Sequence, residues 1–389
     1  KIQILLKSNK DRTLNKKIKK DSKFIPVFEP SVTLKDKLSV LSSLNKKHIS
    51  GTSPVISKFE DALKDEFQSK RAIAVSNGSV ALDLAFQLAD LDIDDEVILP
   101  SFTIISCLSA VIRSGAKPVF CDVDPYSWNM TYKNVENVLT DKTKAILMVH
   151  TYGLPADALK IKELCDSNNI LLIEDTAEAH GQFSDGLLCG TFGSISTLSF
   201  YANKHMTTGE GGALLINDEN YYEKALRMRN LDFNNKKRFQ HDNLYWNYRM
   251  SGLQASLGLS QIKKIQHTIN EKIKQAKIYN KLLEPISNLQ IPLFEYNGST
   301  NHYWVYGVVL KDKSRDELVK FLDNKKIQTR NFFWPLHMQN ALPDKFKTLH
   351  KLPISENLGK NGLYLPLGNH VKEKDQKYIV EAIVNFVKD

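Results

Sequence analysis

Short apolar runs alternate with amphipathic segments over the first half of the chain. Residues 34–44 and 57–67 have apolar positions at the three-and-four spacing of a helix. Because the later strand-like runs are fully apolar and helical segments separate them, the pattern predicts an α/β fold with a mostly parallel sheet flanked by helices. We expect strands within 71–78, 95–101, 116–124, 144–153 and 170–176, and helices within 79–89, 103–115 and 157–169.

The order of elements changes after Asp218. A helix is expected in 219–230, and a long helix over about 251–284 follows a polar, aromatic stretch. A strand in 302–310, a helix in 315–326 and the start of a strand in 328–333 then suggest a smaller α+β unit. The predicted division is a basic tail over 1–23, a large domain over 24–265 and a small C-terminal domain over 266–389.

Composition narrows the class of protein. Of 389 residues, 42% are hydrophobic and 25% are charged, which is typical of a globular protein. No run approaches the roughly 18 apolar residues that span a bilayer, so we do not expect a membrane protein. Residues 1–23 carry nine Lys and Arg and two Asp, so most of the net charge of +9 lies in the tail. A specific nucleic-acid-binding face is therefore not expected.

The four cysteines, at positions 107, 121, 165 and 189, are scattered singly. The absence of a CxxC pair argues against a zinc ribbon or a thioredoxin-type site, and no metal centre is expected. Free thiols are typical of a reducing compartment, so we expect a cytoplasmic protein.

Ligands of parallel sheets bind beyond the carboxyl ends of the strands, so the segments there are candidates for chemistry. Lys204 lies in SFYANKHMTTGEGG, where a lysine is either a Schiff-base nucleophile or an ordinary surface residue. Asp175 follows an apolar strand. Its carboxylate either pairs with a protonated ring nitrogen of a cofactor or caps a helix.

Two further segments follow strands. Gly78 and Ser79 open a helix, whose backbone N–H groups either bind a phosphate or form a plain capped turn. Phe102 lies after another strand and either stacks on a flat ring or belongs to the core. Pyridoxal phosphate is the cofactor favoured by these four segments together. In chain order they offer a phosphate-binding turn, a stacking aromatic ring, a carboxylate and a lysine.

On these residues the chain resembles the sugar aminotransferases of the DegT/DnrJ/EryC/StrS type, which use pyridoxal phosphate and have fold type I. The resemblance runs from about Phe24 to the C-terminus. It rests on SNGSVAL, PSFT, HTYG, EDTAEAHG, SFYANKHMTTGEGG, WNYRMSGLQASLG and TRNFFWPLH. The chain is most similar to the 4-aminotransferases that make perosamine- or viosamine-type sugars of surface glycans from nucleotide-linked 4-keto-6-deoxyhexoses.

The resemblance implies a role for each matching residue. Lys204 would bind the cofactor covalently and move protons, and Asp175 would pair with the pyridine nitrogen. Ala177 and Phe102 would lie against opposite faces of the ring. Glu178 would lie near the ring hydroxyl, at a position where many relatives have Gln.

The remaining roles concern the phosphate, the substrates and the assembly. Gly78, Ser79 and Ser199 would hold the phosphate, and Asn247 would reach the phosphate of the neighbouring subunit. The latter implies a homodimer with shared active sites. L-glutamate would be the amino donor and a nucleotide sugar the acceptor. Weaker candidates for substrate contacts are His180, Arg249, Arg330 and His337.

Several functions stay open at this point. Some relatives have His in place of the lysine and remove a 3-hydroxyl, so Lys204 favours transamination. The alternatives are an aminotransferase acting at C3, a cyclitol aminotransferase of the same family, or a non-catalytic regulator that binds pyridoxal phosphate. The nucleotide, the hexose and the side from which the amine is delivered also stay open.

Overall fold

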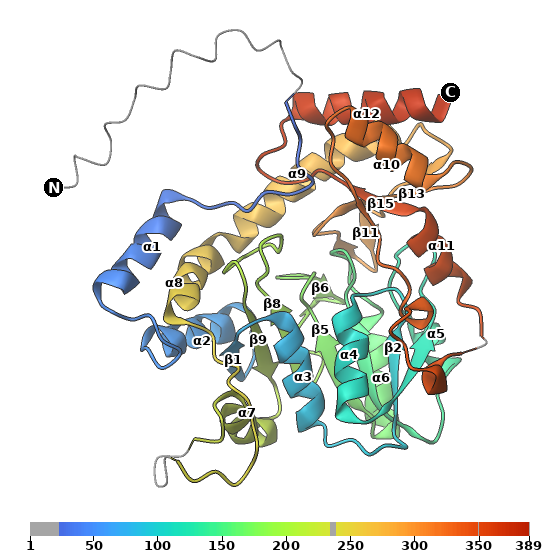
Figure 1. The fold of residues 1–389 in the computed structure, drawn as a ribbon. Coiled ribbons are helices and arrows are strands. Elements are labelled where there is room, and N and C mark those ends of the chain that lie inside the picture. Colours follow the sequence, from blue (N-terminus) through green and yellow to red (C-terminus); the bar gives the residue numbers. More distant parts are fainter. Residues whose placement is uncertain (1–22, 234–238, 349, 389) are drawn as a thin grey trace, which may run out of the picture.

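We describe a computed structural model of the chain, in which residues 23–233, 239–348 and 350–388 are described (Figure 1). Its large sheet has the strand order β1-β9-β8-β5-β4-β2-β3. All neighbours in it are parallel except β9, which is antiparallel to β1 and to β8. The strands are β1 (Arg71–Val75), β2 (Glu96–Pro100), β3 (Lys117–Cys121), β4 (Thr143–Val149), β5 (Leu171–Asp175), β8 (Ile195–Ser199) and β9 (Gly212–Ile216). The predicted α/β fold with a mostly parallel sheet is confirmed.

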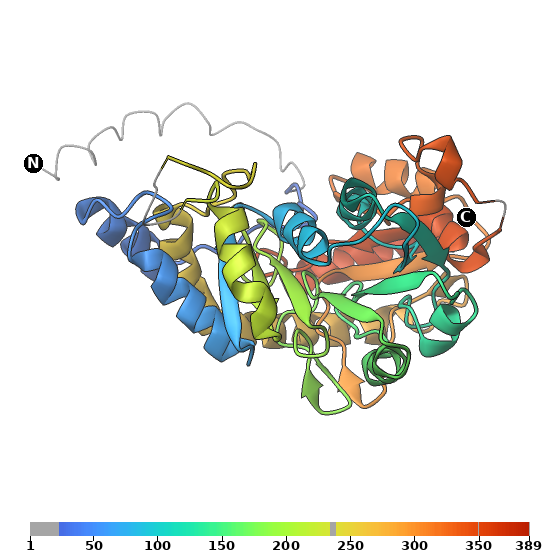
Figure 2. The same ribbon diagram turned by 90° about the horizontal axis from the view of Figure 1, so that it is seen from below.

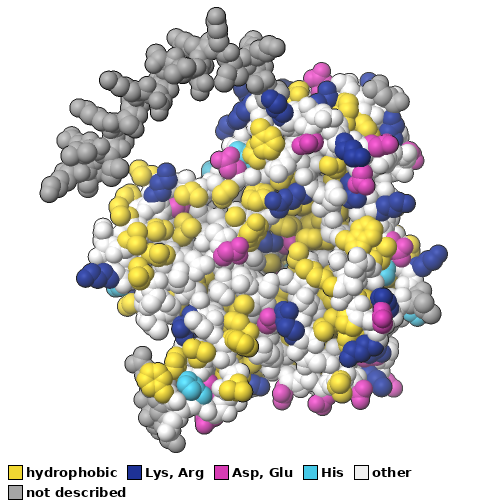
Figure 3. All heavy atoms as spheres, in the orientation of Figure 1, with side chains coloured by type: hydrophobic (Ala, Val, Ile, Leu, Met, Phe, Trp, Pro, Cys, Tyr) yellow, Lys and Arg dark blue, Asp and Glu magenta, His cyan; other side chains and the backbone are white. Residues whose placement is uncertain are grey.

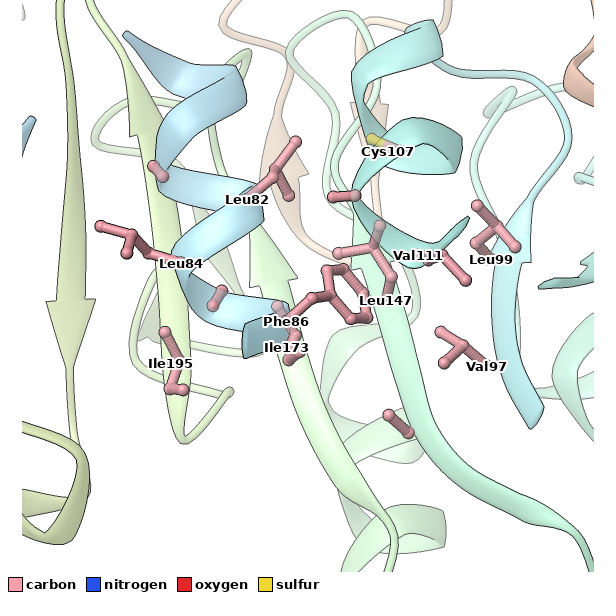
Figure 4. Packing of buried hydrophobic residues seen from close by; sticks show 14 of the residues in the cluster. Leu82, Leu84, Phe86, Val97, Leu99, Cys107, Val111, Leu147, Ile173 and Ile195 are labelled. Carbon is pink, nitrogen blue, oxygen red and sulfur yellow. The ribbon is translucent and has the colours of Figure 1, made fainter. Parts of the chain in front are cut away.

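Helices cover both faces of this sheet (Figure 2). Side chains alternate between the faces, so that Val97 and Leu99 of β2 belong to one core and Ile98 to another. The first core lies under α3 (Gly78–Leu88), α4 (Ile105–Ser114) and α7 (Tyr222–Arg229) (Figure 4). The opposite face packs against α2 (Val55–Glu66), α5 (Tyr132–Glu136), α6 (Ala158–Asn168) and α8 (Gly252–Gln261).

Local sequence signals set where these helices begin and end. Asn77 caps α3, because its side chain accepts a hydrogen bond of 2.9 Å from the backbone N–H of Val80. Gly115 ends α4 with φ +95°, a left-handed conformation that glycine adopts without strain. These residues explain the start of α3 and the end of α4.

The C-terminal unit contains an antiparallel sheet of order β10-β13-β15-β14. Its strands are β10 (Leu289–Gln290), β13 (Tyr306–Leu310), β14 (Arg330–Asn331) and β15 (Gly362–Leu365), and its helices are α10 (Arg315–Asn324), α11 (Pro353–Asn361) and α12 (Glu373–Lys388). Two short hairpins are formed by β6 (Phe183–Ser184) with β7 (Leu187–Leu188) and by β11 (Glu295–Tyr296) with β12 (Ser299–Thr300).

The predicted long helix over 251–284 is two helices, α8 and α9 (Ile265–Leu283), with a 3-10 turn at Ile262–Lys264 between them. The Nζ of Lys264 lies 2.6 Å from a carboxylate oxygen of Asp36, at the start of α1 (Leu34–Asn45). The end of this 3-10 turn thus contacts a segment distant in the sequence, a contact that periodicity does not reveal.

Helix α9 joins two hydrophobic cores (Figure 1). Its residues Ile265 and Ile269 pack under the large sheet, whereas Tyr279 and Leu283 pack in the C-terminal unit. Ile25, which the sequence assigned to the large domain, also packs in the C-terminal core, where it forms a β-bridge with Ile327. The division at residue 265 stays a prediction.

No helix in the described ranges is both long and apolar enough to cross a membrane. The predicted basic tail falls on residues 1–22, which lie outside the described residues, and on Lys23.

A buried carboxylate, Glu174, fixes the end of β5. It accepts hydrogen bonds from the imidazole of His150 and the hydroxyl of Ser196, as well as from the backbone N–H groups of residues 190, 192 and 193. The Nδ1 of His150 accepts from the backbone N–H of Ala156, so its Nε2 donates to Glu174. Burial opposes ionisation, but these donors hold the pKa of Glu174 below its ordinary value. His150 and Glu174 lie near Cys189, but they already use these atoms in hydrogen bonds.

Replacement of this anchor should destabilise the fold. Glu174→Gln puts an amide NH₂ among five donors, so we expect a loss of about 3 kcal/mol in the free energy of unfolding. Thermal unfolding of the cofactor-free protein measures it, with Glu163→Gln on the exposed side of α6 as the control. Equal unfolding temperatures for the two variants would contradict the anchoring role.

Candidate active site

A cavity of about 500 Å³ lies beyond the carboxyl ends of β4, β5 and β8, with the C-terminal unit as its other wall. Segments far apart in the sequence meet there because parallel strands end at the same edge of a sheet. Eight predicted site residues line this cavity: Gly78, Ser79, Asp175, Ala177, Glu178, Ser199, Lys204 and Arg330.

Asp175, the last residue of β5, presents a buried carboxylate to the cavity. One carboxylate oxygen accepts a hydrogen bond of 3.0 Å from the backbone N–H of Ala177, and the other lies 3.5 Å from the thiol of Cys107. Burial raises the pKa of Asp175, against the effects of these donors and the charge of Lys204. A cation placed beside this carboxylate would stabilise its ionised form.

Lys204 shares the cavity with a second buried carboxylate. Its Nζ lies 3.3 Å from Oε1 of Glu178, while Oε2 of Glu178 accepts a hydrogen bond of 3.0 Å from the backbone N–H of Tyr152. Burial raises the pKa of Glu178 to about 7, although Lys204 acts in the opposite direction and Asp175 raises it further. Glu178 can therefore change its protonation state near neutral pH.

The N-terminus of α3 forms a third side of the cavity. Ser79 there shares a hydrogen bond of 2.7 Å with Ser106. A Cβ at Gly78 would lie 2.8 Å from Ser199, and a Cβ at Gly212 would lie 2.5 Å from the backbone of Asn77. Glycine at both positions lets β8 and β9 lie directly against the helix N-terminus, where N–H groups attract an anion.

Phe102 requires a correction. It is fully buried and packs against Tyr152, Phe332 and Phe333 rather than lining the cavity. Two positions later, Ile104 lines the cavity with an exposed fraction of 37%. The prediction selected Phe102 because it is the aromatic residue of the segment. In the structure Phe102 belongs to the core, and the aliphatic Ile104 lines the cavity.

Three of the four predicted substrate contacts also lie away from the cavity lining. His180 is fully buried against Phe67 and Phe200, where burial lowers its pKa to about 3. The guanidinium of Arg249 is hydrogen-bonded to the side chain of Asn230.

His337 ties the chain after β14 to the end of β2, through a hydrogen bond of 2.7 Å to Ser101. Asn247 is exposed and does not line the cavity of its own chain.

The residues present fit pyridoxal phosphate. The carboxylate of Asp175 suits a protonated ring nitrogen, the N-terminus of α3 with Ser79 and Ser199 suits a phosphate, and Lys204 suits an aldehyde. All of them line one cavity, and the raised pKa of Asp175 marks a buried carboxylate that a cationic ring would stabilise.

In the wall that the C-terminal unit contributes, sequence reasoning identified Arg330 alone. Trp304, Phe333 and Tyr364 line the cavity beside Arg330. Only TRNFFWPLH, among the motifs used, touches this wall, so Trp304 and Tyr364 carried no local signal.

Comparison with known proteins matches the chain to aminotransferases, in agreement with a cavity that fits pyridoxal phosphate. The model of the DegT/DnrJ/EryC1/StrS aminotransferase family matches residues 32–384. GDP-perosamine synthase from Escherichia coli O157:H7 is 37% identical over 94% of this chain and all of its own length. The Vibrio cholerae enzyme of the same name is 34% identical over 93% of this chain and 99% of its own. Among solved structures, an aminotransferase from Psychrobacter cryohalolentis has a TM-score of 0.87 and 30% identity, covering 94% of this chain and 99% of its own.

The raised pKa of Glu178 predicts a pH-dependent stability. Between its ordinary value of 4.5 and about 7, the folded protein binds more proton at Glu178 than the unfolded chain does. Stability from this group therefore falls as the pH rises through that window. Glu178→Gln removes the effect, so the cofactor-free variant should gain on the order of 1–3 kcal/mol relative to wild type between pH 4.5 and 7.5.

Denaturant unfolding at several pH values measures this difference, with Glu210→Gln, at an exposed carboxylate on the same cavity, as the control. A constant difference between wild type and Glu178→Gln across this range would contradict the assignment.

Proposed function

We propose that this chain, which belongs to the DegT/DnrJ/EryC1/StrS aminotransferase family, moves an amino group from L-glutamate to C4 of a nucleotide-linked 4-keto-6-deoxyhexose. It is an aminotransferase whose cofactor is pyridoxal 5′-phosphate. The observation that carries the proposal is that Lys204, Asp175 and the N-terminus of α3 line one cavity.

When bound, pyridoxal phosphate stabilises the carbanion that forms when a C–H bond next to the amine breaks. Asp175 would hold a proton on the ring nitrogen, which keeps the ring electron-poor. Ser79, Ser199 and the N-terminus of α3 would hold the phosphate.

Lys204 would move the proton that transamination requires. Its amine must be neutral to accept a proton and charged to return one. Glu178, 3.3 Å from the Nζ and with a pKa raised to about 7, can take up or release the balancing proton. The buried carboxylate thus supports the lysine as general base and general acid.

The substrate class follows from the relatives and from Arg330. Two relatives that are named GDP-perosamine synthase match this chain over nearly its whole length. Arg330 is exposed on the cavity lining, and its guanidinium lies 4.8 Å from the ring centroid of Phe28, which orients it. A planar guanidinium suits the diphosphate of a nucleotide sugar. Such a product would serve surface glycans.

We also propose a homodimer with shared active sites. Helix α1 turns Ser39 and Ser43 toward Ser256 of α8, whereas four leucines on it are about half exposed or more, at positions 34, 38, 41 and 44. Hydrophobic side chains accordingly gather on the surface over α1 (Figure 3). An amphipathic helix with its apolar side outward fits burial against a second copy. The exposed position of Asn247 fits a contact with the partner's phosphate.

The four cysteines are free thiols in the structure. This supports the proposed location in a reducing cytoplasm.

Visible absorption of the purified protein tests the cofactor and the reaction. We expect a visible absorption band that makes the protein yellow and that L-glutamate bleaches. A 4-keto-6-deoxyhexose linked to GDP, dTDP or UDP should then restore this band. Lys204→Ala should lack the band of the covalently held cofactor, whereas Lys162→Ala, on an exposed part of α6, should keep it. Restoration by a 3-keto sugar or a keto cyclitol would overturn the C4 assignment. If the cofactor is bound but glutamate does not bleach its absorption band, the alternative of a non-catalytic regulator would be favoured.

Charge on α1 should break the dimer. The double variant Leu38→Glu, Leu41→Glu should sediment as a monomer, because unpaired carboxylates in an apolar interface are costly. Leu187→Glu, at a leucine with a similar exposed fraction on β7, is the control. A double variant that stays dimeric would show that α1 does not form the interface.

Mixed dimers test the shared site. Lys204→Ala chains are mixed with Asn247→Ala chains at a limiting concentration of cofactor. If Asn247 acts at the partner's site, each mixed dimer contains one site in which both residues are intact. About a quarter of the wild-type activity should return, because half of the dimers are mixed and one of their two sites is complete. No recovery would place Asn247 at the site of its own chain.

A further inference from the structure

Trp304 lies directly beneath the amine of Lys204. The Nζ of Lys204 is 3.7 Å from the centroid of the Trp304 ring, on a residue that is only 6% exposed. The indole Nε1–H donates a hydrogen bond of 3.0 Å to the backbone carbonyl of Asn203, the residue before Lys204. The ring is therefore attached to the same stretch of backbone whose side chain it supports.

Further contacts fix the ring from other sides. The Nζ of Lys272 on α9 donates a hydrogen bond of 2.8 Å to the backbone carbonyl of Trp304. The ring of Phe333 is stacked nearly parallel to the indole, with centroids 6.3 Å apart and planes inclined by 18°. Tyr152 packs against it at a centroid distance of 5.7 Å. Because Lys272 is itself buried, its amine has given up water for this contact, which makes the contact costly to break.

We propose that Trp304 is a positioning residue whose indole face holds the free amine of Lys204 beside Glu178. The proposal rests on the proposed function, in which Lys204 releases the cofactor to the substrate and must stay at the reacting centre. A π face attracts an ammonium ion, most strongly when water is excluded. Unlike a second carboxylate, it cannot take the proton, so it holds the amine without competing with Glu178 for that proton.

The pH behaviour of the amine depends on every group around it. The titratable or charged groups that face it or lie next to it are Glu29, Tyr152, Asp175, Glu178, His180, Tyr201, His205, Glu210, Lys272, His302, Arg330 and Tyr364. A substitution at Trp304 changes none of their identities. A shift in the pH dependence of Lys204 is therefore assigned to the indole face when it follows the strength of the π face across the variants below.

The test measures the reactivity of Lys204 in the cofactor-free dimer. Trace acetylation at a series of pH values, followed by mass spectrometry of the Lys204 peptide, gives the pH at which labelling is half-maximal. In Trp304→Leu this midpoint should fall by about 0.5–1.5 units, since the ring favours the charged amine. Trp304→Phe, which keeps a weaker π face, should fall in between. The kcat for glutamate should drop more than its KM changes.

A matched control separates this role from simple packing. Trp334→Leu, at a partly exposed tryptophan whose indole donates to the carbonyl of Met338, should leave the midpoint in place. A folded Trp304→Leu protein with the wild-type midpoint would overturn the proposal, even if its thermal stability had fallen. If Trp304→Leu does not fold, incorporation of fluorinated tryptophan is decisive. The midpoint should fall with each added fluorine, and an unchanged midpoint would overturn the proposal.

Because acetylation needs no cofactor, the outcome is independent of the proposed function. A wild-type protein that binds no pyridoxal phosphate would contradict the proposed function and would leave the proposal for Trp304 untouched. The labelling midpoints would still decide whether the indole holds the amine.

Discussion

The position of the cavity residues depends on the buried carboxylate of Glu174, which does not itself line the cavity. Glu174 accepts five hydrogen bonds on one face of the large sheet, and thereby ties the end of β5 to the turn at residues 190–193. Because successive residues of a strand point to opposite faces, this anchor directs Asp175 to the other side, where the cavity lies. Fixed backbone is what allows a buried, incompletely paired carboxylate to persist at the adjacent position.

Charge balance explains why the cavity suits a cationic ring. Two buried carboxylates, Asp175 and Glu178, face the single ammonium of Lys204, and burial raises the pKa of both. One cation cannot pair fully with two carboxylates. Lys204 lies in direct contact with Glu178, which leaves Asp175 as the group that gains most from a second positive charge. Under the proposed function, a protonated pyridine nitrogen would supply that charge to Asp175.

The sequence predicted those parts of the fold and site whose signals are local. The apolar strands, the glycine stop of α4 and the segments around Gly78, Asp175 and Lys204 each carry a pattern within about ten residues. The break between α8 and α9 had no such signal, and Lys264 at the break pairs with Asp36, which is distant in the sequence. Phe102 was selected for its aromatic ring, but ring chemistry alone does not distinguish a cavity wall from a core.

The same reasoning explains why most of the wall from the C-terminal unit was missed. Trp304 and Tyr364 lie on the strands of the C-terminal unit or beside them, and only the antiparallel pairing of β13 with β15 brings their segments together. Helix α9 joins this unit to the large sheet and also carries Lys272, which binds the carbonyl of Trp304. Lys204 thus comes from one unit and the indole beside its amine from the other. Arg330 lies on the same unit as Trp304, so any displacement of that unit moves the support of the amine and the proposed diphosphate contact together. That Arg330 and Trp304 both lie on the cavity beside Lys204 arises from the topology rather than from any single motif.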